Sequence, residues 1–320
     1  MSSREEEAEE HSYLEHLDDQ LDDTVSDSEE AQACCTQAPK RERRAHQISE
    51  SKTVRVNEPS VISRVTNNVF AFRDDSREDQ RLCKVHYGEL DEDFREELSI
   101  INRLKHPCLT PIEELRHKPE VGSVIIYKKS SGNLRDFIEQ NGPMSEKVAS
   151  KMFRKIVDTV DYCHQKNVGL GNNIRLYHIV YDDGHSSQIR FDMLDSPIDT
   201  SDSPVTSLRN YSVFYCAPEL IFDIENDFDI VKADLWSLGI LLFKMLTDSY
   251  PFHDTDLKKQ FTRICHQRLP LPGHLSTSAL SVLASLLHKN PEKRATLEDL
   301  KNHPWLNSNS EIDEPKSVLF

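Results

Sequence analysis

The chain has 320 residues and carries 39 lysines and arginines against 55 aspartates and glutamates, a formal net charge of −16. This balance argues against direct nucleic-acid binding, which needs a basic face. No apolar run approaches the ~20 residues of a membrane-spanning helix, and no signal-peptide pattern opens the sequence. The seven cysteines show no CxxC pair. We therefore expect reduced intracellular thiols, no membrane insertion and no nucleic-acid partner.

Residues 1–50 are expected to form a disordered acidic tail. Residues 1–30 contain thirteen acidic residues and one arginine, and like charges at this density resist collapse. A basic cluster follows at 40–44, formed by Lys40, Arg41, Arg43 and Arg44. The cluster is consistent with a nuclear localisation signal and equally with a linker that balances charge.

A regular apolar pattern begins after residue 52, and its first part predicts strands. The predicted strands are short, β-branched or alternating, and they span 54–56, 61–65, 69–72, 82–86 and 123–127. One helix is predicted among them, at 91–104. Phe94, Leu98 and Ile101 of this helix recur at the spacing of a buried face.

A hinge is expected near 128–133, and helices dominate after it. The predicted helices span 145–163, with Ser145 as N-cap, and 233–246, 257–265, 278–287 and 296–302. The expected fold class is therefore α+β, with a small β-rich N-terminal lobe (51–128) and a larger helical C-terminal lobe (133–306). Residues 307–320 would form a C-terminal tail.

Three motifs of the C-terminal lobe resemble those of protein kinases. Ala217-Pro218-Glu219 resembles the Ala-Pro-Glu motif, and Asp234-Leu235-Trp236-Ser237-Leu238-Gly239 resembles Asp-x-Trp-x-x-Gly. Asn290-Pro291-Glu292-Lys293-Arg294 resembles the segment whose arginine pairs with the Ala-Pro-Glu acid. The resemblance implies a protein-kinase-like bilobal fold, in which Glu219 and Arg294 form a buried ion pair. Asp234 would accept backbone N–H groups of the catalytic loop.

Phosphoryl transfer needs a glycine-rich loop over the phosphates and a lysine that binds them. Residues 54–73 contain no glycine, and the matching turn is either 57–60 or 66–68. Leu82-Cys83-Lys84-Val85 resembles the lysine motif. Glu97 lies on the inward face of the predicted helix, so we expect it to pair with Lys84. This pair would be either a vestige of a nucleotide site or a purely structural ion pair.

The segment that matches the catalytic loop has no aspartate at the position of the base. The preferred alignment places Asn173 at the base, Arg175 at the loop lysine and His178 at the metal-binding asparagine. An ungapped alignment places Asn172 at the base instead. In either case an amide replaces the carboxylate, and an amide cannot take the proton of a substrate hydroxyl at neutral pH.

The metal-binding Asp-Phe-Gly motif is replaced by Met193-Leu194-Asp195. A thioether is a poor ligand for Mg²⁺, which prefers oxygen. A slip of one residue would bring Asp192 to this position. We therefore expect a catalytically inactive pseudokinase without a metal cofactor, with weak metal-independent ATP binding as an open alternative.

Residues 80–306 resemble the Tribbles family of pseudokinases. The matching segments are Arg81-Leu82-Cys83-Lys84-Val85, Cys163-His164-Gln165, Leu170-Gly171, Met193-Leu194-Asp195, Tyr250-Pro251-Phe252-His253-Asp254-Thr255-Asp256 and His303-Pro304-Trp305-Leu306. The resemblance implies an adaptor that binds a CCAAT-enhancer-binding-type bZIP transcription factor. It also implies binding of MAP-kinase kinases near His303, Pro304 and Trp305, with effects on stress and immune signalling, and a location in both nucleus and cytoplasm.

Two further expectations come from the same resemblance. The segment between Asp195 and Tyr215 would contact the transcription factor, with Thr200, Ser203 and Thr206 as candidates. Family members recruit a ubiquitin ligase through an Asp-Gln-x-Val-Pro motif in the tail. Here the tail offers Glu311-Ile312-Asp313-Glu314-Pro315, without that Gln and Val, so ligase recruitment is in doubt. Two other hypotheses stay open: a weak kinase or nucleotide-sensing switch, and a protein that acts mainly through its acidic tail.

Overall fold

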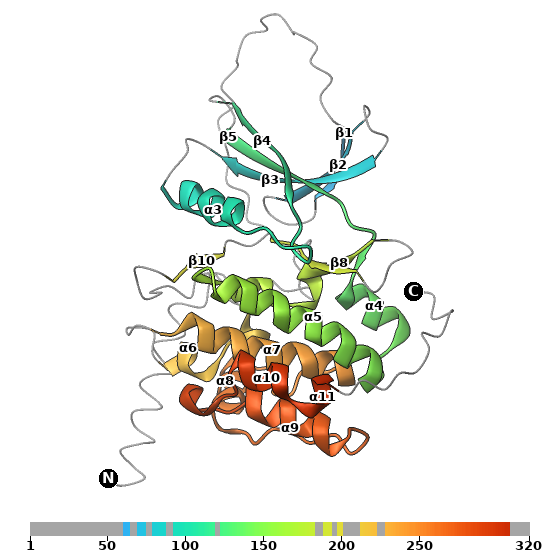
Figure 1. Cartoon of the computed structure of the whole chain (residues 1–320), viewed down its shortest axis with the longest axis vertical. Helices are drawn as coiled ribbons and strands as arrows, with labels where there is room; N and C mark the ends of the chain where they lie inside the picture. Colours follow the sequence, from blue (N-terminus) through green and yellow to red (C-terminus); the bar gives the residue numbers. More distant parts are fainter. Residues whose placement is uncertain are drawn as a thin grey trace, which may run out of the picture. The chain divides into compact units, whose positions relative to one another are not determined.

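Five antiparallel strands form the sheet of the N-terminal lobe (Figure 1). They are β1 (Ser60–Arg64), β2 (Val69–Asp74), β3 (Asp79–Tyr87), β4 (Ile112–Lys118) and β5 (Gly122–Lys128), in the order β1-β2-β3-β5-β4. The predicted strands at 61–65, 69–72, 82–86 and 123–127 correspond to β1, β2, β3 and β5. β4 was missed because it is an exposed edge strand of mostly charged residues, whose pattern does not alternate.

The computed structural model describes residues 60–64, 69–74, 79–87, 92–118, 122–182, 188–193, 197–200, 212–222 and 228–307. These residues all lie within the compact unit Pro59–Phe320. The predicted acidic tail, the basic cluster at 40–44, the strand at 54–56 and residues 308–320 lie outside the described residues.

One helix, α3 (Glu92–Arg103), packs its apolar face against the sheet, as the spacing of its apolar residues predicted. Ala71, Leu82 and Tyr127 lie opposite one another on β2, β3 and β5, so their side chains share one face. They form a buried cluster with Val69, Phe94 and Ile125. This cluster is the core of the lobe and lies next to Lys84.

Helices form most of the C-terminal lobe. They are α4 (Leu134–Asn141), α5 (Glu146–His164), α6 (Pro218–Phe222), α7 (Ile230–Thr247), α8 (Leu257–His266), α9 (Thr277–Leu286), α10 (Leu297–Asn302) and α11 (Pro304–Asn307). All five helices predicted in this lobe are present within a few residues. Ser145 does occupy the N-cap of α5, although its side chain makes no capping hydrogen bond.

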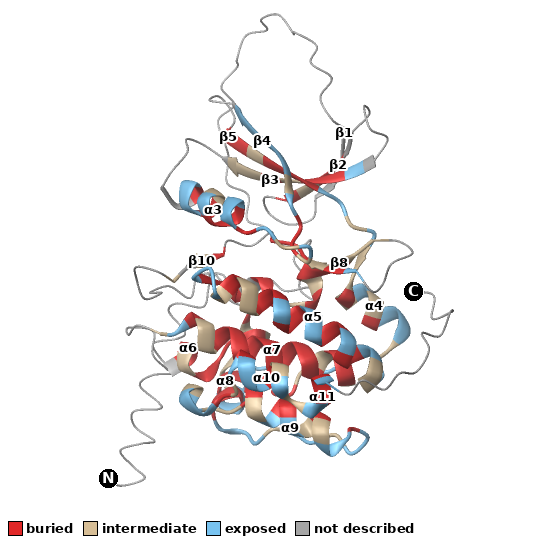
Figure 2. Ribbon diagram, viewed as in Figure 1, coloured by how far each residue is buried: buried red, intermediate tan, exposed pale blue. Residues whose placement is uncertain are grey.

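The central helix α7 is buried on nearly all sides (Figure 2). A methyl group at Gly239 would lie 2.7 Å from Leu287 Cδ2, so glycine is what allows the backbone of α7 to approach α9 so closely. No helix in the described part of the chain is both long enough and apolar enough to cross a bilayer.

Short strands connect the two lobes and position the site. β6 (Gly132–Asn133), β8 (Ile179–Tyr181) and β9 (Ile189–Phe191) form one small sheet, and β7 (Val168–Gly169) pairs with β10 (Ile198–Asp199). Phe191 of β9 donates its N–H to Cys108 O (2.8 Å) and accepts the N–H of Thr110 (2.9 Å). These bonds fasten the segment that follows α3 to the strand that precedes Met193.

Candidate functional site

Lys84 and Glu97 form the ion pair that the sequence predicted. Lys84 Nζ on β3 lies 2.6 Å from Glu97 Oε1 on α3, and the two side chains are only 8% and 7% exposed. A charged pair removed from water in this way depends on each partner for compensation. The pair therefore holds α3 against the sheet, whether or not a phosphate binds there.

Apolar side chains fill the space beside this lysine. In the kinase pattern Val-Ala-Ile-Lys a small alanine stands two positions before the lysine, and here that position is Leu82. Leu82 lies between Ala71 and Tyr127, both fully buried. Burial raises the pKa of the Tyr127 hydroxyl well above its usual value, and the charges of Glu97 and Asp192 raise it further. The ring of Tyr127 is thus a core side chain next to these two carboxylates.

Backbone groups of the hinge are used within the protein itself. Lys129 donates its N–H to Gln80 O (3.3 Å), and its Nζ donates to Gln80 Oε1 (2.7 Å). Ser131 donates its N–H to Tyr181 O (3.0 Å). Ligand pockets commonly fix a ligand through backbone N–H and C=O groups. Two backbone donors of this connection are therefore used for bonds within the protein.

The position of β1 and β2 decides which turn corresponds to the glycine-rich loop. β1 ends at Arg64 and β2 begins at Val69, so the connecting segment is 65–68. This segment contains the candidate turn 66–68, whereas 57–60 precedes the hairpin. Its sequence, Val65-Thr66-Asn67-Asn68, has no glycine.

Asp234 organises the loop that corresponds to the catalytic loop. Its carboxylate accepts the backbone N–H groups of Leu170 and Gly171, each at 2.8 Å, and lies 2.8 Å from His164 Nε2. The first two bonds are those predicted from the kinase motif. They are charge-assisted and buried, so they fix the loop strongly.

The side chain of Asn173 points into the protein. Asn173 ends the 3₁₀ turn η2 (Gly171–Asn173), is fully buried, and donates from Nδ2 to Leu170 O (2.9 Å). Its amide thus stabilises its own turn, which favours the ungapped alignment with Asn172 at the base position. The side chain of Asn172 lies outside the described residues. His178, on η3 (Leu176–His178), is also buried, with Nε2 3.4 Å from Arg175 Nη2.

The residues at the metal position do not suit Mg²⁺. Met193 is the second residue after β9 and is 1% exposed. Asp192 is 6% exposed and donates its backbone N–H to His178 O (2.7 Å). A thioether, an imidazole and one buried carboxylate are not the set of oxygen ligands that Mg²⁺ requires. Within the described ranges no group of three or more His, Cys, Asp or Glu residues could hold a metal ion. The described residues at this position therefore do not supply the oxygen ligands of a magnesium nucleotide.

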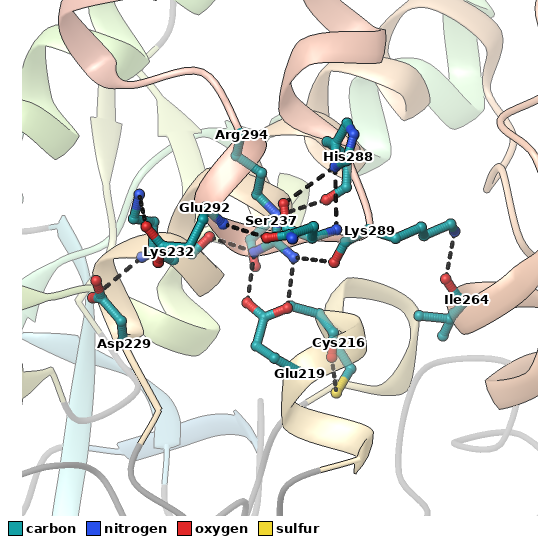
Figure 3. A network of polar contacts seen from close by, with 12 residues as sticks. Cys216, Glu219, Asp229, Lys232, Ser237, Ile264, His288, Lys289, Glu292 and Arg294 are labelled. Atoms are coloured by element: carbon teal, nitrogen blue, oxygen red, sulfur yellow. Dashed lines mark hydrogen bonds and ion pairs between the residues drawn. The ribbon is translucent and has the colours of Figure 1, made fainter. Parts of the chain in front are cut away.

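The structural part of the kinase framework is intact (Figure 3). Arg294 Nη1 and Nη2 each lie 2.5 Å from an oxygen of Glu219. Arg294 also donates to Lys232 O (2.8 Å) and His288 O (2.9 Å), and its side chain is fully buried. These bonds satisfy the guanidinium on all sides and tie α6 to α7 and to the segment after α9.

A half-buried lysine next to this network was not predicted. Lys289 Nζ donates to Ile264 O and lies 3.6 Å from the ring centroid of Phe252 and 4.9 Å from that of Trp236. Removal from water lowers the pKa of Lys289 to about 8. The sequence gives no signal for this contact, because Phe252 and Trp236 lie far from Lys289 along the chain.

The expected partner contact at His303, Pro304 and Trp305 needs a correction. Trp305 is 5% exposed, its Nε1 donates to Glu146 Oε2 (2.9 Å), and its carbonyl accepts from Ser150 Oγ (2.7 Å). Trp305 is therefore an internal anchor and is not available as a surface contact. His303 is half-buried and Pro304 is exposed.

The second group of candidate contacts is described only in part. Thr200 is half-buried and donates its backbone N–H to Asn167 O (2.9 Å), next to β10. Ser203 and Thr206 lie outside the described residues.

Comparison with known proteins agrees with this geometry. Residues 59–306 match a family model described as "Protein kinase domain". Among curated relatives, Tribbles homolog 1 of Homo sapiens is 29% identical over 190 residues, covering 59% of this chain and 50% of that protein. Tribbles homolog 2 of Canis lupus familiaris is 26% identical over 194 residues, covering 60% and 56%. Putative sperm motility kinase W of Mus musculus is 29% identical over 224 residues, covering 69% and 43%. The matches thus span about half the length of these relatives.

Proposed function

The chain belongs to the protein kinase domain family, and we propose that it acts as a catalytically inactive adaptor of the Tribbles type. The observation that carries this proposal is the contrast between the structural framework of the C-terminal lobe and the position where a kinase binds its metal ion. The pair Glu219–Arg294 and the loop anchor Asp234 are complete, whereas Met193 stands buried at the metal position. An intact framework around a metal position without an oxygen ligand favours a scaffold over an enzyme.

The partners follow from the resemblance. We propose MAP-kinase-kinase-type kinases and a CCAAT-enhancer-binding-type bZIP transcription factor as the bound proteins, with effects on MAP-kinase signalling in stress and immunity. Because Trp305 is buried, a kinase partner would contact His303 and Pro304. Recruitment of a ubiquitin ligase stays doubtful because the tail motif is degenerate. The basic cluster at 40–44 supports a location in both nucleus and cytoplasm.

A second candidate is a nucleotide-sensing switch or a weak metal-independent kinase. The specific observation in its favour is the preserved Lys84–Glu97 pair. Against it stand the side chains of Leu82 and Tyr127 and the engaged N–H of Lys129. We therefore expect no cofactor.

A thermal melt of the full chain with ATP, with and without Mg²⁺, separates these two functions. A ligand at about 100 times its dissociation constant stabilises a protein by roughly 2.7 kcal/mol, which shifts the melting temperature of a domain of this size by several degrees. The adaptor predicts a cooperative melt without a shift. A shift in EDTA that Lys84→Ala removes would favour the switch, and peptide phosphorylation that Lys84→Ala abolishes would refute the adaptor.

Binding measurements test the adaptor directly. Immobilised full chain is exposed to a purified MAP-kinase kinase and, separately, to a bZIP factor of the stated type. We expect saturable binding of both, and Pro304→Glu should weaken only the kinase. Pro304 is exposed at the start of α11, so the variant should retain the melting temperature of the wild type. Deletion of residues 1–50 tests the remaining hypothesis: loss of both interactions would place the main activity in the acidic tail.

A further inference from the structure

One side of α5 is basic, although the whole protein is acidic. Basic residues recur along this helix at i, i+4, i+7 and i+8, so they share one side of it: Lys147, Lys151, Arg154 and Lys155. Lys147 is half-buried and the other three are exposed, and Figure 2 shows exposed turns along α5. These four residues, the basic face of α5, therefore present positive charge to the solvent.

Lys151, at the centre of the basic face, is open to a partner. Its side chain is exposed and makes no hydrogen bond or ion pair with the described residues. The acidic residue that follows on the same side of α5 is Asp158, and its carboxylate lies 3.9 Å from Lys301 of α10. The face thus has four basic residues against one acid, which also faces a lysine of another helix.

An exposed apolar residue borders the basic face. Val148 is 38% exposed and is one of three large apolar side chains that the described residues leave this open. It precedes Lys151 by three positions and Lys155 by seven, so the three side chains are neighbours on the helix surface. A segment that fits this surface would therefore combine carboxylates with an apolar side chain.

The described part of the chain ends at the edge of this face. Arg154 Nη1 lies 2.5 Å from Asn307 Oδ1 and 3.3 Å from Leu306 O, at the end of α11. Asn307 also donates from Nδ2 to Lys301 O (2.6 Å). The point from which the C-terminal residues start is thus held against the basic face itself.

The residues that follow have complementary chemistry. Residues 308–320 lie outside the described residues, and their first eight positions hold three acids, one isoleucine and no base: Glu311, Ile312, Asp313 and Glu314 are consecutive. Four residues of extended chain span up to ~14 Å, whereas Lys151 and Lys147 lie only ~4.5 and ~10.5 Å from Arg154 along the helix axis. A segment that starts after Asn307 can therefore reach the whole face.

We propose that residues 311–314 dock on the basic face of α5 of the same chain. The three carboxylates pair with the lysines of the face, and Ile312 covers Val148. Exposed ion pairs are individually weak, but the short connection from Asn307 gives the segment a high effective concentration at this surface. The contact lies within the C-terminal lobe and does not depend on the proposed function.

Zero-length crosslinking of the full chain with a water-soluble carbodiimide tests this contact. The reagent activates a carboxylate, which then forms an amide with a lysine amine in direct contact, while the carbodiimide leaves as a urea. Mass spectrometry should find the tryptic peptide 302–316, whose only side-chain carboxylates are the three acids, linked to lysines of the basic face. Exposed lysines elsewhere, such as Lys259 and Lys293, should give few such links.

Lys151→Glu should lower the yield of links to Lys147 and Lys155 about fivefold, because it turns an attraction into a repulsion. Lys259→Glu is the matched control, since it changes the net charge equally at an exposed site of α8, and it should leave the yield unchanged. A high salt concentration should lower the wild-type yield, because screening weakens exposed ion pairs. Melting temperatures confirm that both variants are folded.

The same experiment separates the other segments that could occupy this face. The yield per chain should be independent of protein concentration, and a yield that rises with concentration would assign the face to a second copy and overturn the proposal. Links from the basic face to acids of residues 1–30 in place of 311–314 would overturn it as well. So would equal yields at Lys259 and Lys293, or a yield that Lys151→Glu leaves unchanged.

Discussion

Arg294 and Glu219 form a two-pronged ion pair in which both nitrogen–oxygen distances are 2.5 Å, although the residues are 75 positions apart. The guanidinium is fully buried and the carboxylate is 15% exposed. Breaking such a pair leaves one charge buried without compensation, which typically costs about 3–5 kcal/mol. The pair is therefore a structural anchor whose energetic role can be measured apart from any catalytic one.

Arg294→Ala is expected to lower the melting temperature by about 10 °C. This figure follows because each kcal/mol of lost stability lowers the melting temperature of a domain of this size by ~2–4 °C. Lys232→Ala is the matched control. Lys232 Nζ lies 3.8 Å from Glu292, whose side chain is 78% exposed, and such surface pairs contribute less than about 1 kcal/mol. Differential scanning calorimetry checks both. Equal melting temperatures for the two variants would contradict the anchor role.

Lys84→Met is expected to destabilise the protein by about 3–5 kcal/mol, because Glu97 would keep a buried charge without its partner. The double variant Lys84→Met with Glu97→Leu should regain much of this loss, since an apolar pair can replace a buried ion pair at little cost. Urea unfolding at pH 7 measures both. If Lys84→Met were as stable as the wild type and removed an ATP-dependent shift, the pair would serve a nucleotide instead.

Some of these relationships could be predicted from the sequence and others could not. The spacing of Phe94, Leu98 and Ile101 defines the inner face of α3, and this face places Glu97 toward Lys84. Asp234 and Arg294 were predictable because short motifs of fixed spacing contain them. The bond between Lys129 N–H and Gln80 O was not, because backbone pairing at a hinge depends on how the two strands meet. Glu146 and Trp305 are 159 positions apart, and neither lies in a motif that names the other.

Tyr127→Phe tests how the space beside Lys84 is filled. The Tyr127 hydroxyl is buried and has no hydrogen-bond partner among the described residues. Its removal should be neutral or stabilising by about 1 kcal/mol, since an unsatisfied buried donor is unfavourable. Burial also raises the pKa of Tyr127. This group therefore leaves the unfolding free energy unchanged with pH below pH ~10 and lowers it at higher pH, where the unfolded tyrosine ionises and the folded one stays protonated.

Unfolding curves at pH 7 and above pH 10 check this prediction. The gap between Tyr127→Phe and the wild type should widen in favour of the variant at the higher pH. Tyr162→Phe is the control and should lower the unfolding free energy at pH 7. The Tyr162 hydroxyl accepts the N–H of Lys105 (2.9 Å), and the variant loses this bond. A clear destabilisation by Tyr127→Phe at pH 7 would show that the hydroxyl is satisfied.

Lys289→Met tests the half-buried ammonium. Removal from water, together with the charge of Arg294, lowers the pKa of Lys289 to about 8 from an ordinary 10.5. Between these values the unfolded chain binds the proton more tightly than the folded protein, so this group makes the unfolding free energy rise with pH. The variant should remove that rise. We expect its stability relative to the wild type to be highest at pH 7 and to decline toward pH 10.5.

Lys293→Met is the control for this pH profile, because Lys293 is an exposed lysine four positions further along the chain. Its unfolding free energy should run parallel to that of the wild type. A parallel profile for Lys289→Met as well would mean that the rings of Phe252 and Trp236 hold the ammonium in its charged form.

Glu146→Gln tests the anchor beneath the partner segment. The Glu146 carboxylate accepts the N–H and the hydroxyl of Ser276, both at 2.6 Å, and the indole N–H of Trp305 at 2.9 Å. Burial alone would raise the pKa of Glu146, but these hydrogen bonds outweigh it and hold the pKa below 4.5. Its stabilisation is therefore present above pH 4.5 and is lost as the pH falls through the lowered value.

At pH 7 Glu146→Gln should lower the unfolding free energy by about 1–2 kcal/mol, the lower part of the range for hydrogen bonds to a charged group, because Glu146 is partly exposed. The difference should shrink as the pH falls below 4.5. Glu139→Gln is the control, since the exposed pair with Arg135 contributes at most about 0.5 kcal/mol. Glu146→Gln should also weaken the binding of a kinase partner at His303 and Pro304, because the bond between Glu146 and Trp305 fixes the start of α11. A pH-independent loss of stability would instead mean that Glu146 acts through packing rather than through its charge.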